Sequence, residues 1–178
     1  MADPHIKEHL DRWDIMTVIL YRSGLTLAPL ALLMMVVSAD YAVFSQWLLM
    51  GAITLCCFSL HIYDKNIRLI VQGCGWLAVL LTLATAYGSL KVFELLGVGA
   101  AYLVLGALCF KESFCFKIPF LRLMPAVFAV DWLLRVSGWS DGYRLLLLVT
   151  AIALIIMAIA KWRMPLHFDI GDKRNYQL

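Results

Sequence analysis

The sequence has few charged residues. Only 15% of its 178 residues are Asp, Glu, Lys or Arg, whereas 63% are apolar and the mean hydropathy is +0.85. Soluble domains carry about 25% charged and about 45 to 50% apolar residues, so this chain cannot cover itself with a polar surface. The composition therefore excludes a soluble enzyme and indicates that lipid is the main solvent.

The chain also lacks room for a separate soluble domain. A membrane-spanning helix needs about 20 residues, and hydropathy predicts six of them, near residues 16–37, 43–63, 69–87, 92–110, 118–136 and 143–162. The connectors are short, so consecutive helices are expected to be antiparallel neighbours. The predicted fold is an all-α membrane protein, a six-helix bundle in which residues 1–178 form a single integral membrane domain.

The N-terminal segment allows two interpretations. Its apolar residues from Ile6 to Leu20 recur at spacings of three or four, which predicts a short N-terminal interfacial helix that runs into the first span. Alternatively, residues 25–37 are the apolar part of a signal peptide, because Val37, Ser38 and Ala39 form a small-residue cleavage site. The long acidic segment before this run favours the interfacial helix.

The distribution of basic residues predicts the orientation. With the N-terminus inside, the cytoplasmic side receives twelve of the 15 Lys and Arg residues, and the other side receives Lys91, Arg135 and Arg144. Cytoplasmic loops of membrane proteins carry this excess. We therefore expect both termini in the cytoplasm and the protein in a bacterial inner membrane. The sequence has no basic run with interleaved aromatic residues, so we expect no nucleic-acid partner.

Three segments resemble a known family. Residues 11–13 (DRW) lead to 21–24 (YRSG), residues 110–116 read FKESFCF, and a Leu- and Pro-rich span follows. Together they resemble the bacterial integral membrane proteins of domain of unknown function 2301 (DUF2301), and 110–116 is the most specific part. The resemblance implies a multi-span membrane protein and supplies no catalytic residues.

Charged residues gather between the fourth and fifth predicted spans. Residues 110–122 contain Glu112, Cys115 and Arg122, and the predicted topology brings His61 and Asp64 to the same membrane face. Such a group could bind an anionic headgroup, a solute or a partner segment. The alternative is an ordinary cytoplasmic loop in which Glu112 pairs with Lys111 or Arg22.

Three charged residues are predicted within the first and fifth spans. Arg22 lies about 10 Å into the first span at 1.5 Å per residue, so it needs a partner or must extend its side chain to the interface. Asp131 precedes Arg135 by four residues, the spacing of an ion pair within one helix. We expect that local pair, although a carboxylate in a membrane often marks a proton or ion route.

Glu94 presents the same choice at a shallower depth. Lys91 lies three residues before it at the start of the fourth predicted span, so a local ion pair is one interpretation and a functional carboxylate is the other.

Metal and cofactor motifs are missing. The five cysteines with His61 could bind copper(I) or zinc, but they include no C-x-x-C pair, so small buried side chains are the expected interpretation. His61 is the only one of four histidines at a span, so bis-histidine haem is not expected. The sequence also has no phosphate loop and no nucleophile elbow. We expect no metal, no cofactor and no catalytic residues.

The charged residues suggest a function without identifying a substrate. Arg22, His61, Glu112 and Arg122 gather at the predicted cytoplasmic end, and Glu94, Asp131 and Arg135 gather at the outer end. The leading hypothesis is binding or transport of a small solute or lipid between the helices. An alternative is a membrane scaffold or assembly factor that recruits partner proteins through residues 111–122 and the C-terminal tail. A third is an enzyme that acts on lipid or quinone through His61, Glu112 and Cys115. Small residues on the fourth predicted span, such as Gly97 and Ala101, allow a homo-oligomer, although packing within the bundle is the expected interpretation.

Overall fold

The computed structural model describes residues 10–88, 91–116 and 118–171. Within these ranges the chain is helical and contains no strand. The helices and two 3-10 turns follow one another as α1 (Arg12–Val37), η1 (Ala39–Tyr41), α2 (Ala42–Phe58), α3 (Lys65–Ala86), α4 (Lys91–Phe116), η2 (Pro119–Arg122), α5 (Met124–Ser137), α6 (Ser140–Trp162) and α7 (His167–Ile170).

Four of these helices, α1, α3, α4 and α6, are long and apolar enough to cross a membrane. The other two expected spans are shorter. α2 has 17 residues and α5 has 14, or about 26 Å and about 21 Å at 1.5 Å per residue, against a hydrocarbon core of about 30 Å. The structure thus gives an all-helical protein with four candidate spans and a shorter apolar helix.

Helix α1 is one continuous helix from the tail to the end of the first span. Asp11 caps it, because its carboxylate accepts from the Asp14 backbone N–H at 2.8 Å and the Asp14 carboxylate accepts from the Asp11 N–H at 3.0 Å. No separate interfacial helix precedes the span between residues 10 and 37. The beginning of the predicted interfacial helix, before residue 10, lies outside the described residues.

Three predicted boundaries were wrong. α2 ends at Phe58, five residues before the expected end, and the fifth helix begins at Met124 after the turn η2. α4 continues to Phe116, so Lys111, Glu112 and Cys115 are helical rather than part of a loop. The hydropathy pattern failed there because it treats a charged residue as an exit from the membrane, whereas Glu112 is buried by partners from other helices.

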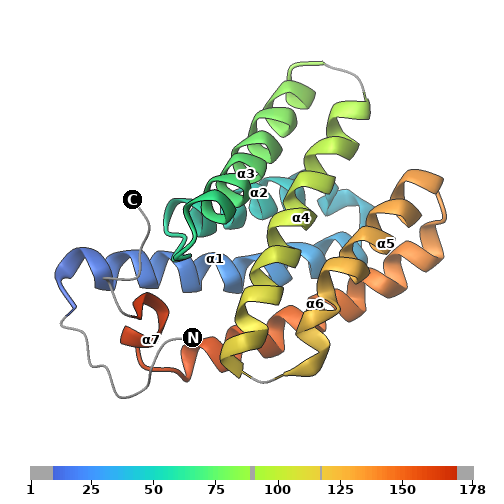
Figure 1. Ribbon diagram of the computed structural model, residues 1–178. Helices are drawn as coiled ribbons and strands as arrows, with labels where there is room; N and C mark the ends of the chain where they lie inside the picture. The colour runs from blue at the N-terminus through green and yellow to red at the C-terminus, as the bar shows by residue number, and fades with distance from the viewer. Residues whose placement is uncertain (1–9, 89–90, 117, 172–178) are drawn as a thin grey trace.

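The helices pack as antiparallel neighbours. α1 packs on both α2 and α6, α3 packs on α4, and α4 packs on α5. Figure 1 shows α7 beside the beginning of α1, with α4 passing steeply across α1 and α6 and with α3 beside α4. Gly24 permits the close contact of α1 with α2, since a Cβ there would lie 2.6 Å from the Cys56 sulfur. Gly138, at φ 76°, ends α5 in the left-handed conformation and turns the chain into α6.

Candidate functional site

A buried charged cluster lies where the ends of α4 and α6 meet α1 and α7. We use the name charged cluster for Tyr21, Arg22, Lys111, Glu112, Lys161 and Asp169. Glu112, which is fully buried, lies at its centre. One carboxylate oxygen accepts from the Tyr21 hydroxyl at 2.8 Å and the other accepts from the Lys161 ammonium at 2.7 Å, while the Lys111 ammonium lies 3.3 Å away.

Arg22 and Asp169 form the other half of the charged cluster. Arg22, 1% exposed, donates from Nε to an Asp169 oxygen at 2.8 Å and forms a salt bridge to the same oxygen through Nη2. Its guanidinium also donates to the backbone carbonyls of Met164 and Pro165. Lys161 links the two halves, because its ammonium pairs with both Asp169 and Glu112.

The four most buried charges of the cluster balance. Arg22 and Lys161 carry two positive charges, Glu112 and Asp169 carry two negative ones, and all four lie within 7% exposure. A buried charge is tolerated when it is paired and hydrogen-bonded. The cluster therefore connects α1, α4, α6 and α7 through paired charges, so removal of any one member would leave a buried charge with fewer partners.

A cavity of about 330 Å³ lies against the charged cluster. Lys111 and Asp169 reach its wall, together with three predicted site residues, His61, Asp64 and Cys115. The Nε2 atom of His61 is buried and has no hydrogen-bond partner among the described residues. Burial, and then the positive charge of Lys111, lower the pKa of His61 to about 4, so the imidazole is neutral at physiological pH.

Two of the predicted residues have clear structural roles. Asp64 caps α3 by accepting from the Ile67 backbone N–H at 2.9 Å. Arg122, on η2, is exposed and its guanidinium lies over the Phe114 ring at 5.5 Å, so it does not join the charged cluster.

A second polar group, which we call the tyrosine cluster, lies toward the opposite end of the bundle. It consists of Glu94 and Tyr102 on α4, Asp131 and Arg135 on α5, and Tyr143 on α6. Arg135 donates to a Glu94 oxygen at 2.7 Å and to the Tyr143 hydroxyl at 2.8 Å. The Tyr143 hydroxyl lies 3.4 Å from that of Tyr102. Glu94, Arg135 and Tyr143 also line an outward cavity of about 500 Å³.

The predicted local pair of Asp131 with Arg135 was wrong. Arg135 instead bonds to α4 and α6, because these neighbours reach its guanidinium across the helix interface. The structure likewise pairs Glu94 with Arg135 rather than with Lys91. Asp131 is fully buried, and neither of its carboxylate oxygens has a hydrogen-bond partner in the part of the chain that the structure describes.

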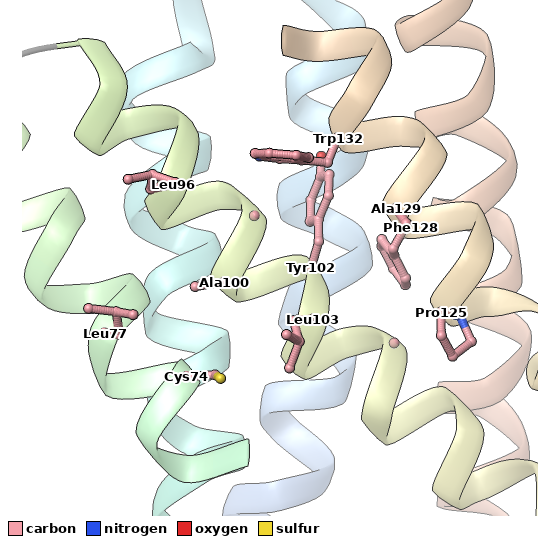
Figure 2. A pocket seen from close by; sticks show the side chains of 12 residues that line it. Cys74, Leu77, Leu96, Ala100, Tyr102, Leu103, Pro125, Phe128, Ala129 and Trp132 are labelled. Atoms are coloured by element: carbon pink, nitrogen blue, oxygen red, sulfur yellow. The ribbon is translucent and has the colours of Figure 1, made fainter. Parts of the chain in front are cut away.

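An apolar groove of about 490 Å³ runs between α3, α4 and α5. Figure 2 shows its wall, with Leu77 from α3, Leu103 from α4, and Phe128 and Trp132 from α5. Tyr102 and Trp132 belong both to this wall and to hydrogen bonds of the bundle, since the Trp132 indole donates to the Leu95 carbonyl at 2.9 Å. The groove therefore borders the tyrosine cluster.

Sequence reasoning missed Tyr21, Lys161 and Asp169 in one cluster and Tyr102 and Tyr143 in the other. A tyrosine and an arginine together inside an apolar run, at 21 and 22, were the available signal for the charged cluster. No such signal marked Asp169, which lies 147 positions from Arg22 along the chain. Among the described residues no three His, Cys, Asp or Glu side chains are grouped to hold a metal ion.

The chain consists of apolar helices joined by short connections, and its buried charges are mostly paired. These features define the class of helical integral membrane proteins. The chain belongs to the family described as uncharacterized integral membrane protein (DUF2301), which matches residues 55–178. An uncharacterized protein of Haemophilus influenzae (strain ATCC 51907 / DSM 11121 / KW20 / Rd) is 42% identical over 178 residues, and the alignment covers all of both chains. No solved structure matches the chain.

Proposed function

We propose that the protein binds an amphipathic, lipid-like molecule that enters sideways from the bilayer into the groove between α3, α4 and α5. The observation that carries this proposal is the groove itself, an apolar space of about 490 Å³ that borders polar groups. Ligand sites are typically apolar clefts of about 300 to 1,000 Å³ with a few polar groups that fix orientation. The groove therefore suits an acyl or isoprenoid chain.

The tyrosine cluster supplies the polar end of the proposed site. Arg135 and Tyr143 line the outward cavity next to the groove, and the exposed Arg144 lies on the same wall. Guanidinium groups hold carboxylates and phosphates with paired hydrogen bonds. A molecule with an apolar chain and an anionic headgroup would match both surfaces, and the protein would act as a binding or transfer protein rather than an enzyme.

We also propose six spans, with α2 and α5 as short crossings, in a bacterial inner membrane with both termini in the cytoplasm. The basic residues support this orientation, since Lys111 and Lys161 lie at the α7 end. Reporter fusions at Asn66 and Leu178 test it, because both positions should report a cytoplasmic location. An external signal at either position would contradict the topology.

The scaffold alternative receives less support. Of the tail that it requires, the part up to Gly171 is tied to the bundle through Asp169, and the remainder lies outside the described residues. On the other proposed surface, residues 111–122, Glu112 is buried within the charged cluster, whereas Phe114, Phe120 and Arg122 are exposed and are the residues that a partner could contact.

Filling the groove tests the binding proposal. Ala129 is exposed on α5 and lines the groove, whereas Ala126, three residues before it, is exposed but does not line it. We expect the protein, purified in mild detergent, to retain a lipid-sized molecule in native mass spectrometry. Ala129→Trp should lose this molecule and Ala126→Trp should keep it. A wild-type protein without such a molecule, or equal retention by both variants, would contradict the proposal.

A further inference from the structure

Asp131 is a buried carboxyl group that the bundle does not neutralise with a cation. It is fully buried on α5, which packs against α4 and α6, and neither oxygen has a hydrogen-bond partner among the described residues. An ionised carboxylate in such a site loses its hydration without a paired cation in return, which costs several kcal/mol or more. The neutral acid avoids most of that cost.

The other titratable groups around Asp131 do not supply a free positive charge. They come from each helix packed against α5, namely Glu94 and Tyr102 from α4, Tyr143 from α6, and Arg135 on α5 itself. The Arg135 guanidinium is held by Glu94 at 2.7 Å and Tyr143 at 2.8 Å. Arg122 on η2 is directed to the Phe114 ring, and Arg144 on α6 is exposed.

A metal cation would fit this site poorly. Hard cations take several oxygen ligands, about six for Mg²⁺ and six to eight for Ca²⁺, whereas among the described residues no three His, Cys, Asp or Glu side chains are grouped to hold a metal ion. The Tyr102 hydroxyl on α4 is a polar neighbour of Asp131, although the pair does not reach regular hydrogen-bond geometry. A proton needs only one acceptor, so it is the ion that this environment can accommodate.

We propose that Asp131 is a proton-binding site, whose carboxyl group is held as the neutral acid in the packed bundle and exchanges its proton with the outward cavity through Tyr102 and Tyr143. The Tyr102 hydroxyl lies 3.4 Å from that of Tyr143, and Tyr143 lines the cavity. In each transfer a tyrosine hydroxyl accepts one proton from the group on one side and donates its original proton to the group on the other side. Both tyrosines therefore end unchanged, and the net event is movement of one proton between Asp131 and water.

The site is independent of the proposed ligand. It predicts a protonated carboxyl group in the ligand-free protein, whether or not an amphipathic molecule occupies the groove. Loss of lipid retention in the Ala129→Trp protein would leave this prediction unchanged, so the two proposals can fail separately.

Infrared difference spectroscopy of the full-length protein in detergent tests the protonation state. Subtracting the spectrum of Asp131→Asn from that of the wild type at neutral pH should reveal the C=O band of one protonated carboxyl group. The matched control is Asp141→Asn, which removes an exposed acid at the start of α6 and should reveal only carboxylate bands. A carboxylate band from Asp131 would overturn the proposal.

The pH dependence of thermal stability gives a second readout. If the folded protein holds a proton that the unfolded chain releases, stability falls as the pH rises. The melting temperature of the wild type, relative to that of Asp131→Asn, should therefore fall as the pH rises from about 4, where an aspartate of the unfolded chain loses its proton, to about 7. A difference that stays constant over this range would contradict the site.

The proposed route needs its own variant, which also serves if Asp131→Asn does not fold. Tyr102→Phe keeps the ring but removes the hydroxyl that contacts Tyr143. After a jump to high pH, the carboxyl C=O band of the wild type should disappear, and in Tyr102→Phe it should disappear more slowly. An equal rate would exclude the tyrosine route, and a wild-type band that is absent from the start would exclude the protonated acid.

Discussion

The two ends of the bundle treat buried acids in different ways. In the charged cluster, Glu112 and Asp169 each contact two groups or more, and those contacts come from other helices. In the tyrosine cluster, Asp131 has no hydrogen-bond partner among the described residues, although Arg135 lies one turn away. The two clusters differ in the number of cations for two acids. The charged cluster has Arg22, Lys111 and Lys161, whereas the tyrosine cluster has Arg135, which pairs with Glu94 and leaves Asp131 without a cation.

This difference suggests a division of labour. Charges that are fully paired on all sides hold helices together, because separating any one member leaves another unpaired in a low dielectric. A single unpaired acid stabilises nothing by itself, and such residues in membranes often mark proton or ligand routes. We therefore assign anchoring to the charged cluster, and our proposals place ligand and proton binding in the half of the molecule that contains the groove and the tyrosine cluster.

Removal of Glu112, the central acid of the charged cluster, should lower the free energy of unfolding more than any other change proposed below. Glu112→Gln leaves the Lys161 ammonium with a single carboxylate partner, Asp169, in a buried site. We expect a loss of about 3 to 5 kcal/mol in the free energy of unfolding, measured by denaturation in mixed micelles. Adding Lys161→Met should restore part of the loss, because the unpaired cation is then removed. No recovery in the double variant would contradict the assigned pairing.

Asp169→Asn should have a smaller effect on the same half. Arg22 keeps its bonds to the Met164 and Pro165 carbonyls, so the loss should be about 1.5 to 3 kcal/mol, the range for hydrogen bonds to charged groups. The segment after α6 should also loosen, and trypsin should then cleave faster after the exposed Arg163. Asp141→Asn is the control. An unchanged cleavage rate in Asp169→Asn would argue against the anchoring role of α7.

His61 should contribute a pH effect at the charged end. Its pKa of about 4 in the folded protein lies below the value of about 6.5 expected in the unfolded chain. Between these pH values the unfolded chain binds a proton at His61 and the folded protein does not. The contribution of His61 to the free energy of unfolding is therefore complete above about pH 6.5 and is lost as the pH falls toward 4. The melting temperature of His61→Asn should fall less than that of the wild type over this range. Parallel curves would show that His61 is protonated in the fold.

The smallest effect is expected from the exposed pair of the other half. The side chains of Glu94 and Arg135 are 31% and 21% exposed, so solvent screens their attraction. Glu94→Gln should change the free energy of unfolding by about 1 kcal/mol or less, and added salt should shrink that difference further. A loss as large as that of Glu112→Gln would remove the contrast between the two clusters.

Sequence reasoning identified the charged residues within the helices more accurately than it identified their partners. It placed Glu112 beside Lys111 and required a partner for Arg22, and the structure supplies both. The partner Asp169 could not be inferred, because it depends on a turn after α6 that brings the tail back to α1. Asp131 and Arg135 show the opposite error, since helical spacing brings two side chains near each other without deciding which neighbours they prefer.

Helix positions followed the same rule. Hydropathy located all four long apolar helices among the described residues, because the tendency of a helix to enter lipid depends on the composition of that segment alone. It ended the fourth span near residue 110, whereas α4 runs to Phe116, because the partners that bury Glu112 come from α1 and α6. The groove was also beyond sequence reasoning, as its walls come from three helices and its volume depends on their separation.

A pair of double-mutant cycles tests the contrast between the two ends most directly. One cycle combines Glu112→Gln with Lys161→Met, the other combines Glu94→Gln with Arg135→Met, and both are measured by unfolding in the same micelles. We predict a coupling energy of about 3 kcal/mol or more for the first pair and about 1 kcal/mol or less for the second. Equal coupling energies, or a larger value for Glu94 with Arg135, would contradict the assignment of anchoring to one end and binding to the other.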